Sequence, residues 1–236
     1  MLLLIVKSEW HLGDEFMGKR ALLFTTGSPF SRIVRVVLDE LGLDYERREE
    51  ITTPSSENRA KLTPTLQVPT FWDGDVHLWE SGLIVEYLLA NYQAPHKDNL
   101  PLANSLYRKE SHWHDRLVAS SIHTLGTSAT TIGQMKWGGT AIDDSDYLTV
   151  CSEQFPYLLG WLENQIPNMG EGFQPGLLSV QDIALGCHFG YILNRPIGID
   201  PKLENIPKIQ NLLDRLNERE SFRNSPILWW EPGVIG

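Results

Sequence analysis

Residues 21–41 constrain the fold more than any other stretch, because two periodicities meet there across one tight turn. The run from Ala21 to Thr25 is short and apolar, which suits a buried strand. From Phe30 to Leu41 the apolar positions recur three or four residues apart, which predicts one face of a helix. Pro29 suits the first helical position and Ser28 the N-cap before it. The stretch therefore predicts a strand, a turn and a helix that starts with a hydroxyl.

The next fifty residues supply the rest of a small sheet domain. Asp73-Gly74 lies between two runs of strand-forming residues, a pattern typical of a β-hairpin. Ser81 is placed to cap the helix that follows. After Leu41 the predicted elements are a strand at 45–51, a short helix at 57–62, hairpin strands at 68–72 and 76–79, and a helix from 81 to 92. Residues 20–93 thus predict an α+β domain with the order βαβ, a short helix, then ββα.

The remainder of the chain reads as helical. A linker at 94–101, with Pro95 and Pro101, separates it from the first domain. Ser179 and Asp182 have the spacing of a capping box, and the helix they start is apolar on nearly every side and must be buried. Further helices are predicted at 102–126, 147–166 and 206–216. Residues 102–236 therefore predict an all-helical domain, whereas residues 1–19 read as an N-terminal extension.

Composition excludes several function classes. The chain of 236 residues has a formal charge of −10 and no Lys/Arg run, which disfavours binding to nucleic acid or to an anionic membrane. No apolar run approaches the roughly 20 residues of a spanning helix. With only Cys151 and Cys187 present, a reduced cytoplasmic protein is the simplest interpretation. No metal site is predicted, since His112 and His114 face different sides of a helix and the acidic loop near Asp143 lacks the spacing of a calcium loop.

The βαβ-ββα order and the motifs "SPFSR", "VPT" and "ESGLIVEYL" together resemble the N-terminal, thioredoxin-like domain of soluble glutathione transferases. The resemblance covers residues 20–220, and the capping box at Ser179 matches the folding signature of the helical domain in that family. "SPFSRIVRVVLDELGLDYE" looks most like the serine-type classes such as theta, zeta and tau. The resemblance implies a thioredoxin-like domain at 20–93, an all-helical substrate domain at 102–236 and a homodimer.

The same resemblance assigns a glutathione site. Ser28 falls on the catalytic serine, where a hydroxyl and a helix N-terminus would favour the glutathione thiolate over the thiol, whose pKa resembles the ~8.5 of free cysteine. Glu80 and Ser81 fall where the family binds the γ-glutamyl ammonium and carboxylate, and Val68-Pro69 on its Val-cis-Pro. The other glutathione contacts that the resemblance implies are Phe30 and Gln67. Taken alone, Ser28 and Ser81 also read as helix caps, and Pro69 as a trans proline.

Two further points bear on binding. The stretch "TPTLQVP" lacks the glycine that relatives often carry before this proline, which puts the glycyl end of the site in question. Arg32 could meet a carboxylate, although a solvated or domain-bridging arginine is the simpler interpretation.

For the second substrate, the candidates on the helix expected at 102–126 are Tyr107, Trp113, His114 and Ile122, which equally suit core or dimer contacts.

The sequence thus predicts a glutathione transferase that adds the glutathione thiolate to an electrophilic, fairly apolar small molecule, as in detoxification. Etherase, isomerase and dehalogenase reactions remain open on these residues. A non-catalytic dimerising or scaffold protein with the same fold is the alternative from another class. A glutathione-dependent disulfide reductase is disfavoured because position 28 is not a cysteine.

Overall fold

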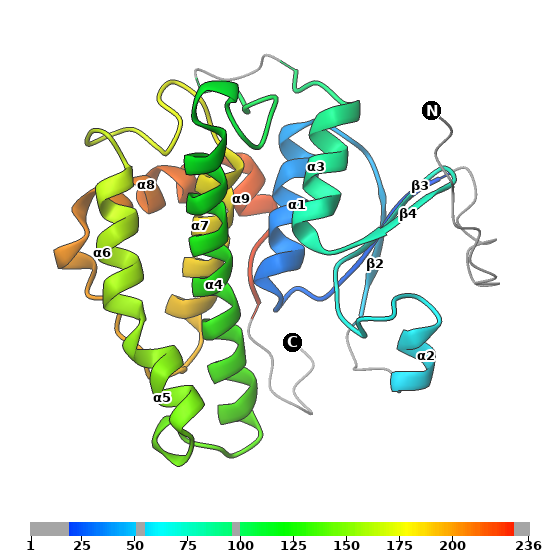
Figure 1. The fold of residues 1–236 in the computed structure, drawn as a ribbon. Helices are drawn as coiled ribbons and strands as arrows, with labels where there is room; N and C mark the ends of the chain where they lie inside the picture. Colours follow the sequence, from blue (N-terminus) through cyan, green and yellow to red (C-terminus); the bar gives the residue numbers. More distant parts are fainter. Residues whose placement is uncertain (1–18, 51–54, 96–99, 229–236) are drawn as a thin grey trace.

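A computed structural model describes residues 19–50, 55–95 and 100–228. Two parts lie side by side: a sheet domain, and a helical domain that contains the long helix α4 (His112–Trp137). The two helices α1 (Pro29–Glu40) and α3 (Ser81–Asn91) lie between the sheet and the helical domain (Figure 1). The α+β arrangement, with a thioredoxin-like sheet domain first, confirms the predicted fold class.

The sheet has four strands in the order β2-β1-β3-β4. Strand β1 (Arg20–Phe24) pairs in parallel with β2 (Glu46–Glu49) and antiparallel with β3 (Thr70–Asp73), which forms the predicted hairpin with β4 (Val76–Trp79). Gly74 supplies the positive φ of 60° that the hairpin turn requires. The short helix α2 (Ser56–Ala60) follows β2 along the chain. All the elements predicted for this domain are present, with ends shifted by a few residues.

The helical domain contains α4, α5 (Asp146–Glu153), α6 (Phe155–Gln165), α7 (Val180–Asn194), α8 (Pro207–Glu218) and the short α9 (Glu220–Asn224). Three single-turn 3-10 segments, at Lys109–Ser111, Ile142–Asp144 and Leu203–Asn205, precede α4, α5 and α8. The capping box is confirmed: Ser179 Oγ accepts from the Asp182 N–H at 3.1 Å, and the Asp182 carboxylate accepts from the Ser179 N–H at 2.8 Å. As predicted, α7 is buried along almost its whole length.

Two predicted helices differ from the observed ones. The helix expected at 102–126 begins ten residues later and runs on to Trp137, because Leu102 and Ala103 are extended and pair with the chain around Leu178 instead. The helix expected at 147–166 is divided between α5 and α6 beside Pro156, whose ring removes a backbone donor and crowds the preceding turn.

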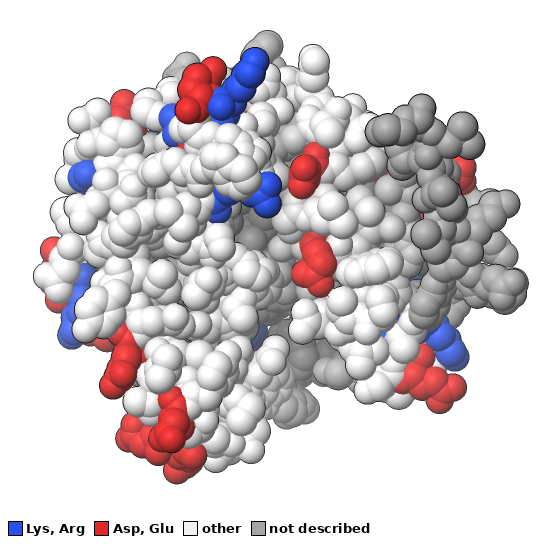
Figure 2. Space-filling model, viewed as in Figure 1, with Lys and Arg blue, Asp and Glu red and all other residues white. Residues whose placement is uncertain are grey.

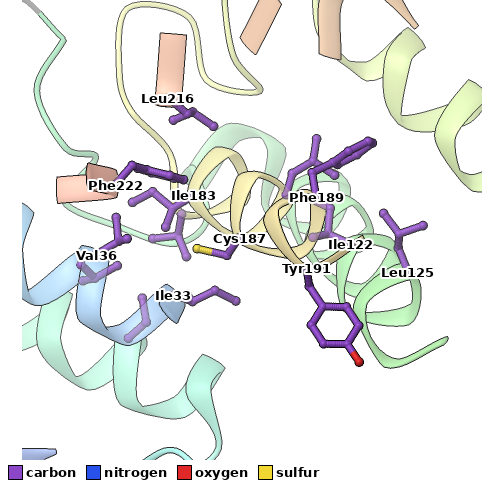
Figure 3. Close-up of a cluster of buried hydrophobic side chains, with 14 of the residues drawn as sticks. Ile33, Val36, Ile122, Leu125, Ile183, Cys187, Phe189, Tyr191, Leu216 and Phe222 are labelled. Atoms are coloured by element: carbon purple, nitrogen blue, oxygen red, sulfur yellow. The ribbon is translucent and has the colours of Figure 1, made fainter. Parts of the chain in front are cut away.

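Buried apolar side chains from both domains form one continuous cluster around α7. Figure 3 shows Ile33 and Val36 of α1 facing Cys187 and Ile183 of α7, with Phe222 of α9 beside them. Ile122, which the sequence left open as a substrate contact, is fully buried here in the core. Helix α1 therefore packs on the sheet with one side and on the helical domain with the other.

Polar contacts also join the two domains. Arg32 donates through Nε to the Ser225 carbonyl at 2.6 Å and through a terminal nitrogen to the Phe222 carbonyl at 3.2 Å. Arg219 forms a two-point pair with the carboxylate of Glu40 at 2.9 and 2.7 Å. Arg32 is thus domain-bridging, the simpler of its two interpretations.

None of the helices in the described part of the chain is long and apolar enough to cross a membrane. On the face shown in Figure 2, the Lys and Arg side chains of the described residues are scattered, while acidic side chains gather at the lower end, where α4 is followed by α5. Asp143, Asp144 and Asp146 lie on that connection and are exposed. The residues 1–18 predicted as an extension, and the aromatic C-terminal tail from 229 onward, lie outside the described residues.

Candidate functional site

A cavity of about 960 Å³ lies between the two domains. One wall comes from the sheet domain, through the start of α1, the segment before β3 and the start of α3; the other comes from the second half of α4 and the end of α7. Its volume is at the upper end of the roughly 300–1,000 Å³ typical of small-molecule sites. The sheet-domain wall includes Thr25, Gly27, Ser28, Pro29, Phe30, Arg59, Thr65, Leu66, Gln67, Val68, Pro69, Glu80 and Ser81.

Ser28 is the N-cap of α1, as predicted. Its Oγ accepts a hydrogen bond from the Ser31 N–H at 3.2 Å, and Pro29 occupies the first helical position. Since the oxygen accepts from the helix, the hydroxyl proton is left to donate to something else, and no acceptor for it lies among the described residues. A half-buried O–H donor at the positive end of a helix favours an anion beside it.

The Val68-Pro69 peptide bond is cis, so the trans alternative is wrong. Val68 is half-buried at the edge of the cavity, whereas Gln67 and Leu66 before it are exposed. Leu66 has a φ of 58°, a left-handed conformation that is uncommon for a leucine. The segment thus presents its backbone and the Gln67 amide to the cavity.

The turn into α3 differs from the prediction in one respect. Ser81 is the first helical residue and the N-cap is Glu80, whose φ of 72° is again left-handed. No side chain caps α3, so helix capping does not explain the presence of Glu80 and Ser81 at this turn. The first N–H groups of a helix without a side-chain cap suit an anionic group, and the Glu80 carboxylate beside them suits a cation.

A polar cluster that includes two cavity-lining residues, Arg59 and Thr65, lies at the segment before β3. The hydroxyls of Thr63 and Thr65 are hydrogen-bonded at 2.9 Å, and Arg59 forms an ion pair with Glu50. Burial raises the pKa of Glu50, while the Arg59 guanidinium opposes that shift. These residues occupy the region in which the usual glycine is missing from the sequence.

Phe30 forms an aromatic cluster with two histidines that the sequence did not single out. Its ring lies 4.9 Å from that of His188 and 5.6 Å from that of His123, measured between centroids. His188 is fully enclosed, and burial, helped by the positive charge of His123, lowers its pKa to about 3. His188 is therefore neutral, whereas His123 is exposed and lines the cavity.

The residues expected to contact a second substrate require a correction. Tyr107, Trp113 and His114 do not line the cavity: Trp113 is 78% exposed, and His114 is hydrogen-bonded to Gln165 of α6. They lie before or within the first turn of α4, which starts at His112 rather than at residue 102. At 1.5 Å per residue, Trp113 is about 15 Å along the helix from His123, the first residue of α4 that lines the cavity.

The residues that do form this wall were missed. They come from one face of α4 and from the end of α7: His123, Thr127, Thr130, Thr131, Gly133, Gln134, Lys136, Trp137, Tyr191, Arg195, Pro196 and Ile197. A weak signal was available in Gly126 and Gly133, seven residues apart, because small residues at helical spacing indicate close approach of another helix. The predicted end of the helix at residue 126 placed most of these residues outside it.

Comparisons with known proteins bear directly on this geometry. Residues 22–96 match the model of the glutathione S-transferase N-terminal domain. The glutathione S-transferase of Methylobacterium radiotolerans, solved in complex with glutathione sulfonate, superposes with a TM-score of 0.72 at 21% identity, covering 92% of this chain and 99% of that one. Residues 22–96 thus match the N-terminal domain of glutathione S-transferases, and the chain shares the fold of solved glutathione S-transferases.

Two curated relatives illustrate the range of proteins that the chain resembles. The glutathione S-transferase-like protein OpS6 of Beauveria bassiana is 28% identical over 201 residues, which are 80% of this chain and 86% of that protein. A stringent starvation protein A homolog of Haemophilus ducreyi is 36% identical over 73 residues, 31% of this chain and 33% of that protein. The names of these relatives thus differ: one records a likeness to glutathione S-transferases and the other does not.

Proposed function

We propose that this glutathione transferase-like protein is a serine-type enzyme that transfers the glutathione thiolate to an electrophilic small molecule. The observation that carries the proposal is a convergence: Ser28, cis-Pro69, Glu80 and Ser81 come from three separate turns and line the same cavity. Two structural neighbours, one solved with glutathione sulfonate and one with glutathione bound, support glutathione as the ligand.

In the proposed complex, each part of glutathione meets a group of matching chemistry. The γ-glutamyl carboxylate accepts from the N–H groups at the start of α3 and from Ser81, while its ammonium pairs with Glu80. The backbone of Val68 pairs with the cysteinyl unit in the manner of a strand, and Gln67 contacts the peptide. The glycyl end then lies toward Thr65 and Arg59, where this sequence departs from its relatives.

The chemical step depends on the ionisation of the sulfur. The Ser28 hydroxyl donates a hydrogen bond to the thiolate, and the α1 dipole adds to its stabilisation. The thiol proton leaves to solvent, and the sulfur forms a new bond to the electrophilic carbon. In a substitution, the leaving group departs with its bonding electron pair; in an addition, the π bond at that carbon opens and its electron pair takes up a proton from solvent. Each unit by which the thiol pKa falls contributes about 1.4 kcal/mol in favour of the reactive anion.

A homodimer is part of the proposal. Trp113 and Leu117, one turn apart on α4, and Leu83 of α3 are large apolar side chains that are more than half exposed. A second copy that covered them would remove this apolar surface from water. Sedimentation equilibrium tests the homodimer, and a monomer at all concentrations would contradict it.

We expect the protein in the cytoplasm.

The test of the proposed function is a glutathione titration in which thiolate absorbance is followed as the pH is raised. Wild-type protein should show the thiolate at a lower pH than free glutathione, and Ser28→Ala should lose most of that shift. Ser28→Thr keeps a hydroxyl and should keep much of it. Ser55→Ala, which removes the N-cap of α2 outside the cavity, controls for the loss of a helix cap, worth about 1 kcal/mol of stability.

The outcomes separate the enzyme from its alternative. Saturable binding with a thiolate shift that Ser28→Ala abolishes supports the transferase. Binding with an unchanged shift in Ser28→Ala would assign activation of the sulfur to another group. No saturable binding would favour a glutathione-independent binding protein, the alternative suggested by the similarity to a stringent starvation protein A homolog.

A further inference from the structure

The face of α4 that lines the cavity is polar, while Trp137, Tyr191, Pro196 and Ile197 add apolar surface to the same helical-domain wall. His123, Thr127, Thr131 and Gln134 recur three or four residues apart on α4, so they form one face of the helix, and that face lines the cavity. Thr130 lies on the same face and donates its hydroxyl proton to the Gly126 carbonyl at 2.9 Å. A molecule bound here would therefore meet the hydroxyl and amide groups of α4 as well as the apolar side chains beside them.

Two cations complete this wall. Lys136 lies in the last turn of α4, and Arg195 directly follows α7. Both line the cavity, and none of the other described residues of the helical-domain wall is acidic. The single acidic residue among the described cavity residues is Glu80, on the opposite, sheet-domain wall.

The packing of α4 on α7 fixes where these cations lie. A Cβ at Gly133 would overlap the Tyr191 hydroxyl, and one at Gly198 would lie 3.3 Å from Lys136 Nζ. In Figure 3 the Tyr191 ring points away from the buried cluster, and its hydroxyl end is directed outward. The Arg195 guanidinium lies against the Tyr191 ring, 5.4 Å from its centroid, and also touches Gly27, the neighbour of Ser28. Arg195 is therefore close to the serine that would activate sulfur.

Glutathione has carboxylates of its own, but the sheet domain already offers partners for both. The N-terminus of α3 with Ser81 suits the γ-glutamyl carboxylate, and the segment from Arg59 to Gln67 suits the glycyl carboxylate. Lys136 and Arg195 come from the other domain, in the half of the cavity left for the second substrate.

Building on the transferase function, we propose that the second substrate is an electrophile bearing a carboxylate, which Lys136 and Arg195 bind while the polar face of α4 solvates the rest of the molecule. This assignment differs from the fairly apolar substrate that the sequence predicts. Charge-assisted hydrogen bonds to a carboxylate are about twice as strong as neutral ones, so they select for the anion.

A matched pair of electrophiles tests the proposal. The first is a chlorodinitrobenzoate with its carboxylate para to chlorine, and the second is its primary amide. In both, the glutathione sulfur forms a bond to the ring carbon, chloride leaves, and the thiol proton is released to solvent. Each kcat/KM is divided by the uncatalysed rate constant of the same electrophile with glutathione, which removes the difference in intrinsic reactivity.

Wild-type protein should prefer the carboxylate by about tenfold after this correction. Lys136→Gln and Arg195→Gln should each reduce that ratio several-fold, mainly through KM. Lys109→Gln removes the same charge from an exposed position outside the cavity and should keep the ratio. Equal use of both electrophiles by the wild type, or preference for the amide, would overturn the proposal.

A binding measurement keeps the proposal separate from the transferase function. The glutathione conjugates of the two probes are prepared chemically, and their dissociation constants are measured by calorimetry. Tighter binding of the carboxylate conjugate, weakened by Lys136→Gln, supports the proposed site even if turnover is absent. If the substitutions weaken glutathione itself and leave the ratio of the two conjugates unchanged, the cations serve glutathione and the proposal is wrong.

Discussion

His188 is a titratable side chain kept from titrating by its surroundings. Its ring is enclosed between Phe30 and the backbone of Gly126, and its Nδ1 has no hydrogen-bond partner among the described residues. Burial, with a smaller contribution from the charge of His123, lowers its pKa from 6.5 to about 3. In the unfolded chain the same ring takes up a proton near its ordinary pKa.

This difference predicts a loss of stability in mild acid. Between pH 6.5 and about 3 the unfolded state binds a proton on His188 that the folded state does not, so stability rises with pH across that window and falls as the pH is lowered. The contribution is about 1.4 kcal/mol per pH unit. Urea unfolding at neutral pH and near pH 5 checks this. The free energy of unfolding of His188→Gln should depend less steeply on pH than that of the wild type.

An unchanged slope in His188→Gln would place the acid sensitivity in another group.

The sheet-domain residues that the sequence singled out lie together on one wall of the cavity. Ser28, Pro69, Glu80 and Ser81 sit in turns whose local chemistry is readable, because proline, helix caps and tight turns leave marks over a few residues. Their functional roles stay predictions. His123, Lys136 and Arg195 carry no such mark, since only the packing of two helices brings them to the cavity.

The close approach of α4 to α7 depends on two glycines of α4. At Gly126 a Cβ would overlap the His188 ring, and at Gly133 it would overlap the Tyr191 hydroxyl. Both contacts join α4 to α7, and the second lies beside the cavity. The spacing of these glycines therefore sets both the packing of the helical domain and the width of its binding wall.

We expect Gly126→Ala to destabilise the protein by roughly 1–3 kcal/mol, because His188 is buried and cannot move aside without strain. Gly160→Ala in α6 is the matched control: nothing lies within 4 Å of its Cβ position, so it should stabilise the helix by up to about 1 kcal/mol. Urea unfolding measures both. A tolerated Gly126→Ala would show that the two helices can separate at little cost.

The helical domain also shows what sequence patterns leave undetermined. The start of α7 was predicted to the residue because a capping box fixes it locally. The start of α4 was not, because Leu102 and Ala103 are apolar enough to continue a helix, and their pairing with Leu178 is a contact between distant segments. The break between α5 and α6 was marked by Pro156 and could have been read.

For the whole molecule, the ion pair between Glu40 and Arg219 is a strong polar link between the domains. Both side chains are largely buried, and Ser221 also donates to the Glu40 carboxylate. Removing one member of such a pair leaves the other buried and unpaired, which is costlier than removing both.

A double-mutant cycle should show this coupling. We expect Arg219→Gln to lower the free energy of unfolding by about 3 kcal/mol, and the combination of Glu40→Gln with Arg219→Gln to lower it by less than the sum of the single changes. Additive effects would mean that the pair contributes little to holding the domains together. Arg223→Gln, on the exposed side of α9, serves as the control.

Helix α1 is buried on one side by the sheet and on the other by the helical domain, and this arrangement affects how the protein folds during synthesis. Of its partners on the helical side, α7 is encoded about 150 codons downstream, and the carbonyls of Phe222 and Ser225 nearly two hundred. On the ribosome, therefore, the sheet domain emerges with one side of α1 still facing water, and that side is covered only when synthesis is almost finished. A chaperone that recognises apolar helix faces would find its longest opportunity to bind in that interval.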